Sequence, residues 1–324
     1  MNRGLPGTNR GYTAASEFPW KVVQMNPRTV VHDWSGSRIL PLHIQLIPTN
    51  RCNSRCEWCS CSAVDRQIEL PTQEILDLLT YFEDLGTRAV TITGGGEPSL
   101  HPGMPEIFKK CEQLGIKIGV VTNGLIWSRD AADYSYLNYA TWMRISVTDT
   151  RNAYDTGIIT QLAAKVDKVD IGISFTVPWD DVNLDTAQDI CKLAHATPNI
   201  THIRFVNDVL NPNPTTLNNV RNACSWCDKA IFQDRSTYTT GTKNCLISLL
   251  KPIIDATGLI YPCCGVQYAT EELRRLPEKM SMGRWTEFHK RSNFDGSGCK
   301  KCYYSSYNTA LQNLTQPIPH PDFV

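Results

Sequence analysis

The chain has 324 residues, including 32 basic and 32 acidic side chains and 13 cysteines. Its zero formal net charge provides no overall attraction to nucleic acid or to an anionic membrane, so binding to a polyanion is unsupported, although a local basic patch is compatible with it. No segment approaches the roughly 20 apolar residues that a membrane-spanning helix needs, and the start lacks an apolar core of signal-peptide length. We therefore expect a cytoplasmic protein whose clustered cysteines bind metal rather than form disulfides.

Residues 1–41 are rich in Gly, Pro, Asn and Arg and are predicted to form an N-terminal arm. From residue 42 on, apolar runs that are typical of strands alternate with segments of helical periodicity. The predicted strands are 42–47, 89–93, 117–122, 142–147, 168–177 and 202–206, and the predicted helices are 72–85, 105–114 and 184–196. This alternation predicts an α/β domain over residues 42–210, with a parallel sheet or open barrel whose ligands gather at the carboxyl ends of the strands.

Residues 211–305 are predicted to form a second, smaller domain. It begins with residues 211–219, which are rich in turn formers and are interpreted as a linker. Seven of the 13 cysteines lie between residues 224 and 302, in a stretch with few long periodic elements, so we expect metal rather than a large apolar core to hold this domain together. Residues 306–324 form a tail, and the aromatic stretch 303–314 is expected to pack back on the barrel.

Three cysteines with the spacing C-x3-C-x2-C follow the first predicted strand, namely Cys52, Cys56 and Cys59. Four thiolates would close a zinc site or fill all irons of a cubane, whereas three leave one iron of a [4Fe–4S] cluster open to a ligand that the protein does not supply. An iron without a protein ligand indicates a catalytic cluster. Cys61 would complete a set of four, so we interpret it as a bystander. The isolated Cys111 and Cys191 lie in helical stretches and are interpreted as buried apolar residues.

Together with Gly94-Gly-Gly-Glu97-Pro98 after the second strand, these cysteines give the sequence a specific likeness: it resembles the radical S-adenosylmethionine (SAM) enzymes. The resemblance implies a partial (β/α)6 barrel in which the three cysteines hold a [4Fe–4S] cluster and the open iron binds SAM. An external low-potential electron donor would reduce the cluster, and cleavage of SAM would give a 5′-deoxyadenosyl radical that abstracts hydrogen from a substrate carbon.

The resemblance also implies residues that bind SAM. Gly95, Gly96 and Glu97 would receive its methionine amino group, because glycines let the backbone approach a ligand closely. Trp58 stands where the family has an aromatic residue just before the third cysteine, and its face would pack on the cofactor. The alternative for Trp58 is plain core packing.

Further candidates for SAM binding lie at the ends of later strands. Ser146 and Asp149 stand where the family often has a polar cluster for the ribose or the carboxylate of SAM, although their spacing is one residue longer than usual. Asn123, with Thr122, ends the third strand and has either a ligand or a structural role. Arg204, in the sixth strand, would meet a carboxylate or form an ordinary surface ion pair.

A second set of cysteines begins at Cys245, followed by twelve residues, a glycine, four residues and Cys263, and then by Cys299 and Cys302 spaced C-x2-C. This arrangement resembles the auxiliary cluster domains of radical SAM enzymes that are known as SPASM and, when shortened, twitch. No cysteine follows Cys302, so the resemblance implies the shorter kind, with one auxiliary [4Fe–4S] cluster held by these four residues. Cys264 is an alternative to Cys263.

Cys224 and Cys227 form another C-x2-C pair that departs from this pattern. They are open to three interpretations: ligands of a second auxiliary cluster or substitutes within the first, a structural zinc site, or packing cysteines without a metal.

The sequence therefore favours a radical SAM enzyme that oxidises, cross-links or rearranges a peptide, an amino-acid-derived group or a small molecule. One alternative is the modification of a nucleotide or of a nucleic-acid-linked group. The other is a non-catalytic iron–sulfur or zinc protein that transfers electrons or acts as a scaffold, in which Glu97 and its glycines would have no purpose.

Overall fold

The computed structural model describes residues 30–33, 36–129, 133–269 and 274–315. Most of the predicted N-terminal arm, residues 1–29, lies outside the described residues, as do residues 316–324 of the predicted tail. The described part of the arm is an antiparallel hairpin of β1 (Val30–Asp33) and β2 (Gly36–Ile39). In the described part of the chain, no helix is long and apolar enough to cross a membrane.

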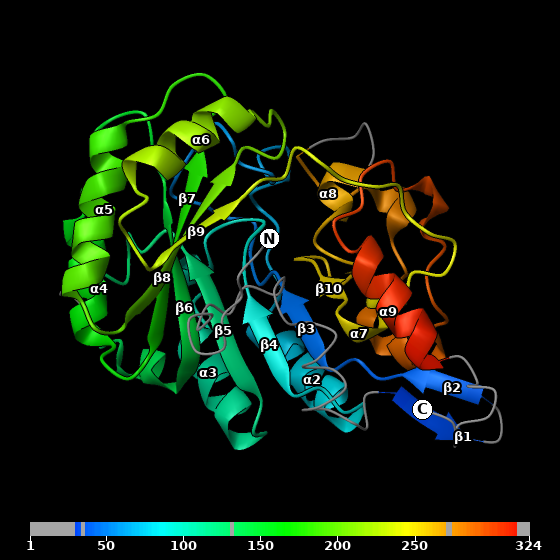
Figure 1. The fold of residues 1–324 in the computed structure, drawn as a ribbon. Helices are drawn as coiled ribbons and strands as arrows, with labels where there is room; N and C mark the ends of the chain where they lie inside the picture. The colour runs from blue at the N-terminus through cyan, green and yellow to red at the C-terminus, as the bar shows by residue number, and fades with distance from the viewer. Residues whose placement is uncertain (1–29, 34–35, 130–132, 270–273, 316–324) are drawn as a thin grey trace, which may run out of the picture.

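A nine-stranded sheet forms the centre of the molecule (Figure 1). Its order is β11-β10-β3-β4-β5-β6-β7-β8-β9, and every neighbouring pair is parallel except β11 with β10. The strands are β3 (His43–Leu46), β4 (Ala89–Ile92), β5 (Lys117–Thr122), β6 (Ala140–Val147), β7 (Asp170–Val177), β8 (Ile200–Asn207), β9 (Ala230–Gln233), β10 (Ile253–Ile254) and β11 (Ile260–Tyr261). The six strands predicted from the sequence are β3 to β8, so the prediction of an α/β fold with a parallel sheet is confirmed.

Helices connect the parallel strands, as right-handed crossovers require. They are α2 (Thr72–Asp84), α3 (Met104–Gln113), α4 (Gly157–Lys165), α5 (Leu184–Ala196) and α6 (Pro214–Ala223), with a 3₁₀ turn, Ser135–Tyr139, between β5 and β6. Figure 1 shows α4 and α5 along the outer side of the sheet. The open inner side is therefore the face that is available for a ligand.

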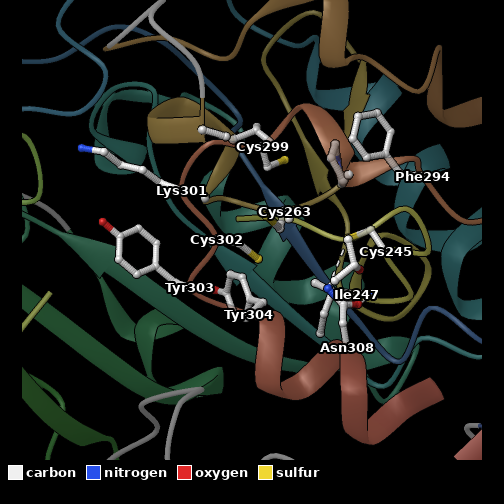
Figure 2. Close-up of a pocket in the computed structure, with 17 residues that line it drawn as sticks. Cys245, Ile247, Cys263, Phe294, Cys299, Lys301, Cys302, Tyr303, Tyr304 and Asn308 are labelled. Carbon is white, nitrogen blue, oxygen red and sulfur yellow. Dashed lines mark hydrogen bonds between the residues drawn. The ribbon is translucent and has the colours of Figure 1, made fainter. Parts of the chain in front are cut away.

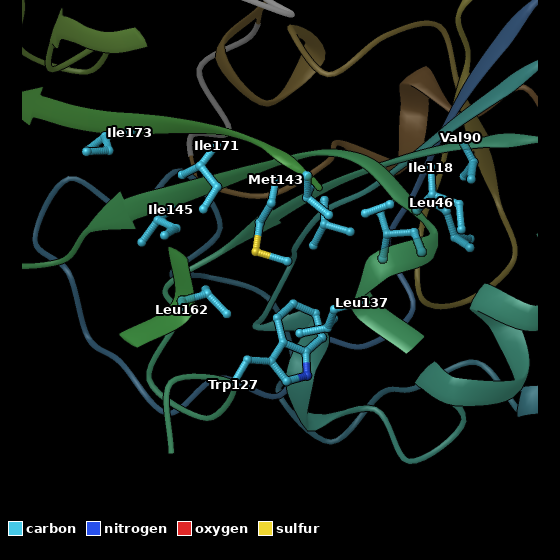
Figure 3. Close-up of a cluster of buried hydrophobic side chains, with 14 of the residues drawn as sticks. Leu46, Val90, Ile118, Trp127, Leu137, Met143, Ile145, Leu162, Ile171 and Ile173 are labelled. Atoms are coloured by element: carbon cyan, nitrogen blue, oxygen red, sulfur yellow. The ribbon is translucent and has the colours of Figure 1, made fainter. Parts of the chain in front are cut away.

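The main hydrophobic core lies between the outer face of the sheet and these helices (Figure 3). Strand alternation decides which side chains enter it. On β6, Met143 and Ile145 are fully buried in the core, whereas Arg144 and Ser146 face the inner side and line a pocket there. The sheet thus has an apolar outer face and a polar inner face.

Residues 211–219 are not a linker, so this interpretation was wrong. Most of the stretch belongs to α6, where the side chain of Asn213 accepts a hydrogen bond from a backbone N–H of the first turn at 2.9 Å and a proline occupies the first position. Leu217 and Val220, one turn apart, are buried in the main core. The turn-forming residues of this stretch cap a helix instead, since Asn and Pro favour both turns and the first positions of helices.

The sheet continues beyond residue 210 at both of its edges. β9 pairs with β8 at one edge, and β10 pairs with β3 at the other. Short elements surround β10 and β11, namely α7 (Ile247–Leu250), α8 (Val266–Ala269), α9 (Ser305–Thr315) and the 3₁₀ turns Glu278–Met280, Trp285–Lys290 and Gly296–Gly298. The predicted second domain therefore supplies edge strands to the sheet of the first.

The expectation that the aromatic C-terminal stretch packs back on the barrel holds for Tyr303, whose ring centroid lies 5.4 Å from Cζ of Arg235 just after β9, and not for α9, which packs on the smaller part of the molecule. α9 lies beside α7 (Figure 1), and its Leu311 is fully buried against Ile247 and Leu250. The apolar faces of α7 and α9 are buried against each other in one cluster, which removes both from water.

Candidate functional site

The loop that carries Cys52, Cys56 and Cys59, here called the cysteine loop, follows the carboxyl end of β3 and precedes α2. All three thiols are partly buried. Backbone N–H groups of the loop point at two of them: Ser54 donates to Sγ of Cys52 and Cys61 donates to Sγ of Cys59, each at 3.4 Å. Such bonds stabilise a thiolate, which is the form that binds metal.

The three thiols of the cysteine loop are close enough to interact electrostatically. Burial raises the pKa of Cys56 to about 11, and the neighbouring thiols of Cys59 and Cys52 add to this effect. A bound metal cation would lower the pKa of these thiols again, because it stabilises the deprotonated ligands. In the described ranges, no group of three His, Cys, Asp or Glu side chains is already arranged as a metal site. The fit to an iron–sulfur cluster therefore rests on the donor set, three soft thiols on one loop.

The glycines after β4 bring that strand end against the entry of the cysteine loop. A Cβ atom on Gly95 would overlap the side-chain oxygen of Asn50, and one on Gly96 would overlap the carbonyl oxygen of Arg51. The backbone N–H of Glu97 donates to the same carbonyl of Arg51 at 2.7 Å. Glycine is thus required here for the contact between two loops of the protein, in addition to any role toward a ligand.

Glu97 is only 3% exposed and joins the ends of β4 and β5. Its Oε1 accepts hydrogen bonds from Oγ1 of Thr122 at 2.6 Å and from the backbone N–H of Ser99 at 3.1 Å, while Oε2 accepts one from the backbone N–H of Asn123 at 2.7 Å. Burial raises the pKa of Glu97, and these hydrogen bonds oppose the rise. Because a carboxylate oxygen accepts about two hydrogen bonds, Oε2 has room for one more donor.

Asn123 connects the end of β5 to the cysteine loop. Its Nδ2 donates to Oδ1 of Asn53 at 2.7 Å and to Oγ of Ser54 at 3.1 Å, and its Oδ1 accepts from the backbone N–H of Leu125 at 3.0 Å. Both side-chain donors are therefore used to position the loop.

Asp149 lies in the turn after β6 and is engaged within that turn. Its Oδ1 accepts from the backbone N–H groups of Arg151 at 3.2 Å and Asn152 at 3.1 Å, and its Oδ2 accepts from the side chain of Asn152 at 3.0 Å. The hydrogen bond from the Asn152 side chain is the main cause that lowers the pKa of Asp149. The carboxylate thus shapes a loop. Like Glu97 and Asn123, Asp149 is not among the residues that line the pocket on the inner side of the sheet.

A pocket of about 250 Å³, here called the barrel pocket, lies on the inner side of the sheet. It brings together Cys56, Trp58 and Cys59 of the cysteine loop with Ser146 of β6 and Arg204 of β8. Arg204 does not form a surface ion pair, so that alternative was wrong; it lies inside the barrel. Three of the predicted cofactor-binding side chains therefore share one pocket with two of the predicted cluster ligands.

A second, smaller cavity, of about 20 Å³, lies in the smaller part of the molecule (Figure 2). Cys245, Cys263, Cys299 and Cys302 all line it, although they come from three separate segments of the chain. Burial raises the pKa of Cys299 to about 12, and the thiols of Cys245 and Cys302 contribute. Four thiols that line one cavity are the donor set of a closed [4Fe–4S] or zinc site.

The neighbouring Cys264 points elsewhere. The residues that line the second cavity include Cys263 and not Cys264, and Sγ of Cys264 lies 3.3 Å from the hydroxyl of Tyr304. Sequence reasoning also missed Asn308 on α9, whose Nδ2 donates to Sγ of Cys245 at 3.6 Å. No spacing signal marks such an outer residue, because it reaches the thiol through a helix that is remote in sequence.

Cys191 of α5 lies beside Cys224 and Cys227 at the end of α6, a group that sequence reasoning did not recognise. All three are buried. Hydrogen bonds to Cys224 and Cys227 raise the pKa of Cys191, while the bond from Cys191 lowers the pKa of Cys227 to about 7. The interpretation of Cys191 as an isolated packing residue therefore misses two polar partners.

Part of the chain is similar to a known protein family. Residues 46–178 match the model of the Radical SAM superfamily. This segment is a radical SAM domain. It contains the cysteine loop, Glu97 with its glycines, and Ser146, whereas Arg204 and the cysteines of the second cavity follow it in the sequence. The resemblance seen in the sequence is confirmed over the matched residues.

Curated relatives match the chain around this radical SAM domain. The S-adenosylmethionine-dependent nucleotide dehydratase of Flammeovirga pacifica is 29% identical over 126 residues, which are 36% of this chain and 43% of that protein. The PqqA peptide cyclase of Methylorubrum populi is 36% identical over 95 residues, 28% of this chain and 24% of that protein. The chain thus matches less than half of the length of these relatives.

Solved structures extend the likeness beyond the radical SAM domain. Streptococcus suis SuiB bound to its precursor peptide SuiA aligns with a TM-score of 0.54 at 15% identity, over 81% of this chain and 66% of that chain. The structure of anSMEcpe with bound AdoMet and the Kp18Cys peptide aligns with a TM-score of 0.51 at 15% identity, over 82% and 87%. At these identities the likeness shows a shared fold.

Proposed function

We propose that the chain reductively cleaves SAM and uses the resulting 5′-deoxyadenosyl radical to abstract hydrogen from a carbon of a peptide, an amino-acid-derived group or a small molecule, for oxidation, cross-linking or rearrangement. The observation that carries the proposal is that Cys56 and Cys59 share the barrel pocket with Ser146 inside a radical SAM domain. The names of PqqA peptide cyclase and of the SuiB complex support a peptide. The name of the nucleotide dehydratase supports a nucleotide as the second candidate.

Cys52, Cys56 and Cys59 would hold the [4Fe–4S] cluster, whose donor requirements they fit. When bound and reduced by an external low-potential donor, the cluster and SAM supply the radical chemistry. Glu97 would orient SAM by accepting a hydrogen bond from its ammonium group at Oε2. This carboxylate is suited to the task because Thr122 and two backbone N–H groups already hold it in place.

The remaining groups of the barrel pocket would position the cofactor and exclude water. Trp58 provides an aromatic ring next to Cys59, and Ser146 provides a hydroxyl in the same pocket. Asn123 contributes indirectly, because its two bonds hold the cysteine loop against β5.

The four cysteines of the second cavity, Cys245, Cys263, Cys299 and Cys302, would hold one auxiliary [4Fe–4S] cluster. They line a single cavity, and four thiols leave no position open. Such a cluster suits the transfer of an electron rather than the binding of a substrate. It would accept an electron from the substrate radical, which favours oxidation or cross-linking, or it would serve as a relay.

Anaerobic reconstitution with iron and sulfide, followed by incubation with SAM and dithionite, tests the proposal. We expect 5′-deoxyadenosine and methionine from the wild type, no product from Cys56→Ala, and retained product formation in the matched control Cys61→Ala. The proposal fails if the wild type contains its full iron and sulfide but forms no 5′-deoxyadenosine.

Iron analysis tests the auxiliary site separately. A variant that lacks the cysteine-loop ligands should retain about four irons per chain if there is one auxiliary [4Fe–4S] cluster and about eight if there are two. Loss of all iron from this variant would contradict an independent auxiliary site. The replaced residues are Cys52, Cys56 and Cys59.

A further inference from the structure

Three arginines converge on the barrel pocket from neighbouring parts of the sheet. Arg144 lies on β6, Arg204 on β8, and Arg235 two residues after the end of β9. All three line the pocket together with Cys56 and Cys59. The sheet thus places three permanent positive charges near the site where hydrogen abstraction is proposed to occur.

Two of these guanidinium groups have unused hydrogen-bond donors. The Nε atoms of Arg144 and Arg204 are buried and have no hydrogen-bond partner. Arg204 donates from Nη2 to Oγ of Ser174 at 2.8 Å, and Arg144 lies over the ring of Trp142, with its Cζ 5.8 Å from the ring centroid. A buried donor without a partner is costly, so these groups are arranged for an acceptor that comes from outside the protein.

In the part of the chain that the structure describes, none of these three arginines forms an ion pair with a carboxylate; the ion pairs there involve other arginines and lysines. Burial lowers the pKa of Arg144 to about 10, and the charge of Arg235 adds to this effect. Burial, followed by the charges of Arg144 and Arg235, also lowers the pKa of Arg204. The arginines therefore repel one another inside the barrel.

Asp208 is the carboxylate among the described residues that line the barrel pocket, and it is directed toward its own loop. Its Oδ1 accepts a hydrogen bond from the backbone N–H of Leu210 at 2.9 Å. His202, on the same face of β8 as Arg204, adds no positive charge at neutral pH, because burial and the two nearby arginines lower its pKa to about 4. The three arginines outnumber the single carboxylate of Asp208, so the described side chains of the pocket wall carry a net positive charge.

We propose that Arg144, Arg204 and Arg235 bind a phosphoryl group of the substrate. The inference rests on the proposed function and narrows its substrate class to a phosphorylated small molecule. Guanidinium groups bind phosphate oxygens in a bidentate manner, and a terminal phosphate offers three acceptor oxygens and nearly two negative charges. One carboxylate, such as that of SAM, would balance a single arginine, whereas the nearly two negative charges of a phosphate match the excess that the three arginines leave over Asp208.

Calorimetric titration of the reconstituted enzyme with inorganic phosphate and pyrophosphate, at constant ionic strength, tests the proposal. We expect pyrophosphate to bind the wild type, with an affinity about tenfold or more lower in Arg144→Gln and in Arg204→Gln, because each loses a charge-assisted hydrogen-bond donor. Arg88→Gln is the matched control, since Arg88 is exposed and precedes β4 at the amino end of the sheet. It removes the same charge and should leave the affinity unchanged.

Further measurements assign the arginines to the substrate rather than to SAM. Arg144→Lys retains the charge and should recover part of the pyrophosphate affinity, and succinate should bind the wild type more weakly than pyrophosphate. In both glutamine variants, the affinity for pyrophosphate should fall more than the affinity for SAM. The proposal is overturned if the wild type binds neither anion, if succinate binds as tightly as pyrophosphate, if Arg88→Gln weakens binding equally, or if SAM affinity falls more.

These outcomes are separable from a failure of the proposed function. If the wild type binds pyrophosphate through Arg144 and Arg204 but forms no 5′-deoxyadenosine, the anion site stands and radical chemistry fails. If it forms 5′-deoxyadenosine but binds no phosphate or pyrophosphate, the phosphoryl site fails and radical chemistry stands.

Discussion

Replacement of Glu97 by Gln removes one negative charge from the junction of β4, β5 and the cysteine loop while keeping the side-chain shape. The carboxylate accepts from Thr122, Ser99 and the backbone of Asn123. In either orientation of the new amide, its NH₂ group faces a backbone N–H, that of Asn123 or that of Ser99. The variant therefore loses one charge-assisted hydrogen bond, which is worth about 1.5–3 kcal/mol.

A second effect of Glu97→Gln acts in the opposite direction. Burial raises the pKa of Glu97, so the ionised carboxylate carries a desolvation penalty that the neutral amide avoids. We therefore expect a net loss of only about 1–2 kcal/mol in the free energy of unfolding, measured by urea titration followed by circular dichroism. The affinity for SAM should fall about tenfold or more, because the ammonium group of SAM loses its anionic partner.

Thr122→Val is the matched control for this variant. It removes the 2.6 Å hydrogen bond to Glu97 but leaves the carboxylate charge in place. Its stability should fall by about 1–2 kcal/mol, as in Glu97→Gln, while its affinity for SAM should stay within about threefold of the wild type. Equal SAM affinity in the two variants would refute the role of Glu97 as an ammonium partner and leave it as a residue that only supports the loop.

Three further predictions concern other parts of the molecule. Cys263→Ser should reduce the auxiliary iron content sharply and Cys264→Ser should not, because Cys263 lines the second cavity and Cys264 does not; the opposite result in iron analysis would make Cys264 the ligand. Asn123→Ala should release cysteine-loop iron faster to a chelator, since both bonds from its amide nitrogen to the loop are lost, and unchanged release would contradict its positioning role. The pKa of His202 is about 4, against 6.5 when unfolded, so the unfolded state binds more protons between these values and stability should fall as the pH decreases from 6.5 to 4. In His202→Gln this fall should be smaller by up to about 3 kcal/mol in urea titrations, and equal pH dependence would contradict the assignment.

Much of the sheet and several site residues follow from local patterns in the sequence. The apolar runs that became β3 to β8 are long enough to be recognised, and ligand-binding residues in parallel sheets follow strand ends. This reasoning placed Cys56, Trp58 and Ser146 at the carboxyl ends of the strands, and the structure shows them in one pocket.

Other features depend on contacts between distant segments and were not predictable in this way. β10 has two residues and α7 has four, too short for any periodicity to stand out. Arg144 occupies a strand with ordinary alternation of apolar and polar residues, and only the tertiary fold shows that it lines the same pocket as Arg204 and Arg235. The cluster of Cys191 with Cys224 and Cys227 likewise arises from the packing of two helices.

The parallel pairing of β10 with β3 has a consequence for how the chain is made. β3 ends at Leu46 and its partner begins at Ile253, about 200 residues later. At roughly 5–20 residues per second, the edge of β3 waits for about 10–40 s of synthesis before its partner is available. An unpaired strand edge is a template for pairing with other chains, so versions of the protein that end before Ile253 should aggregate even when their radical SAM domain is complete.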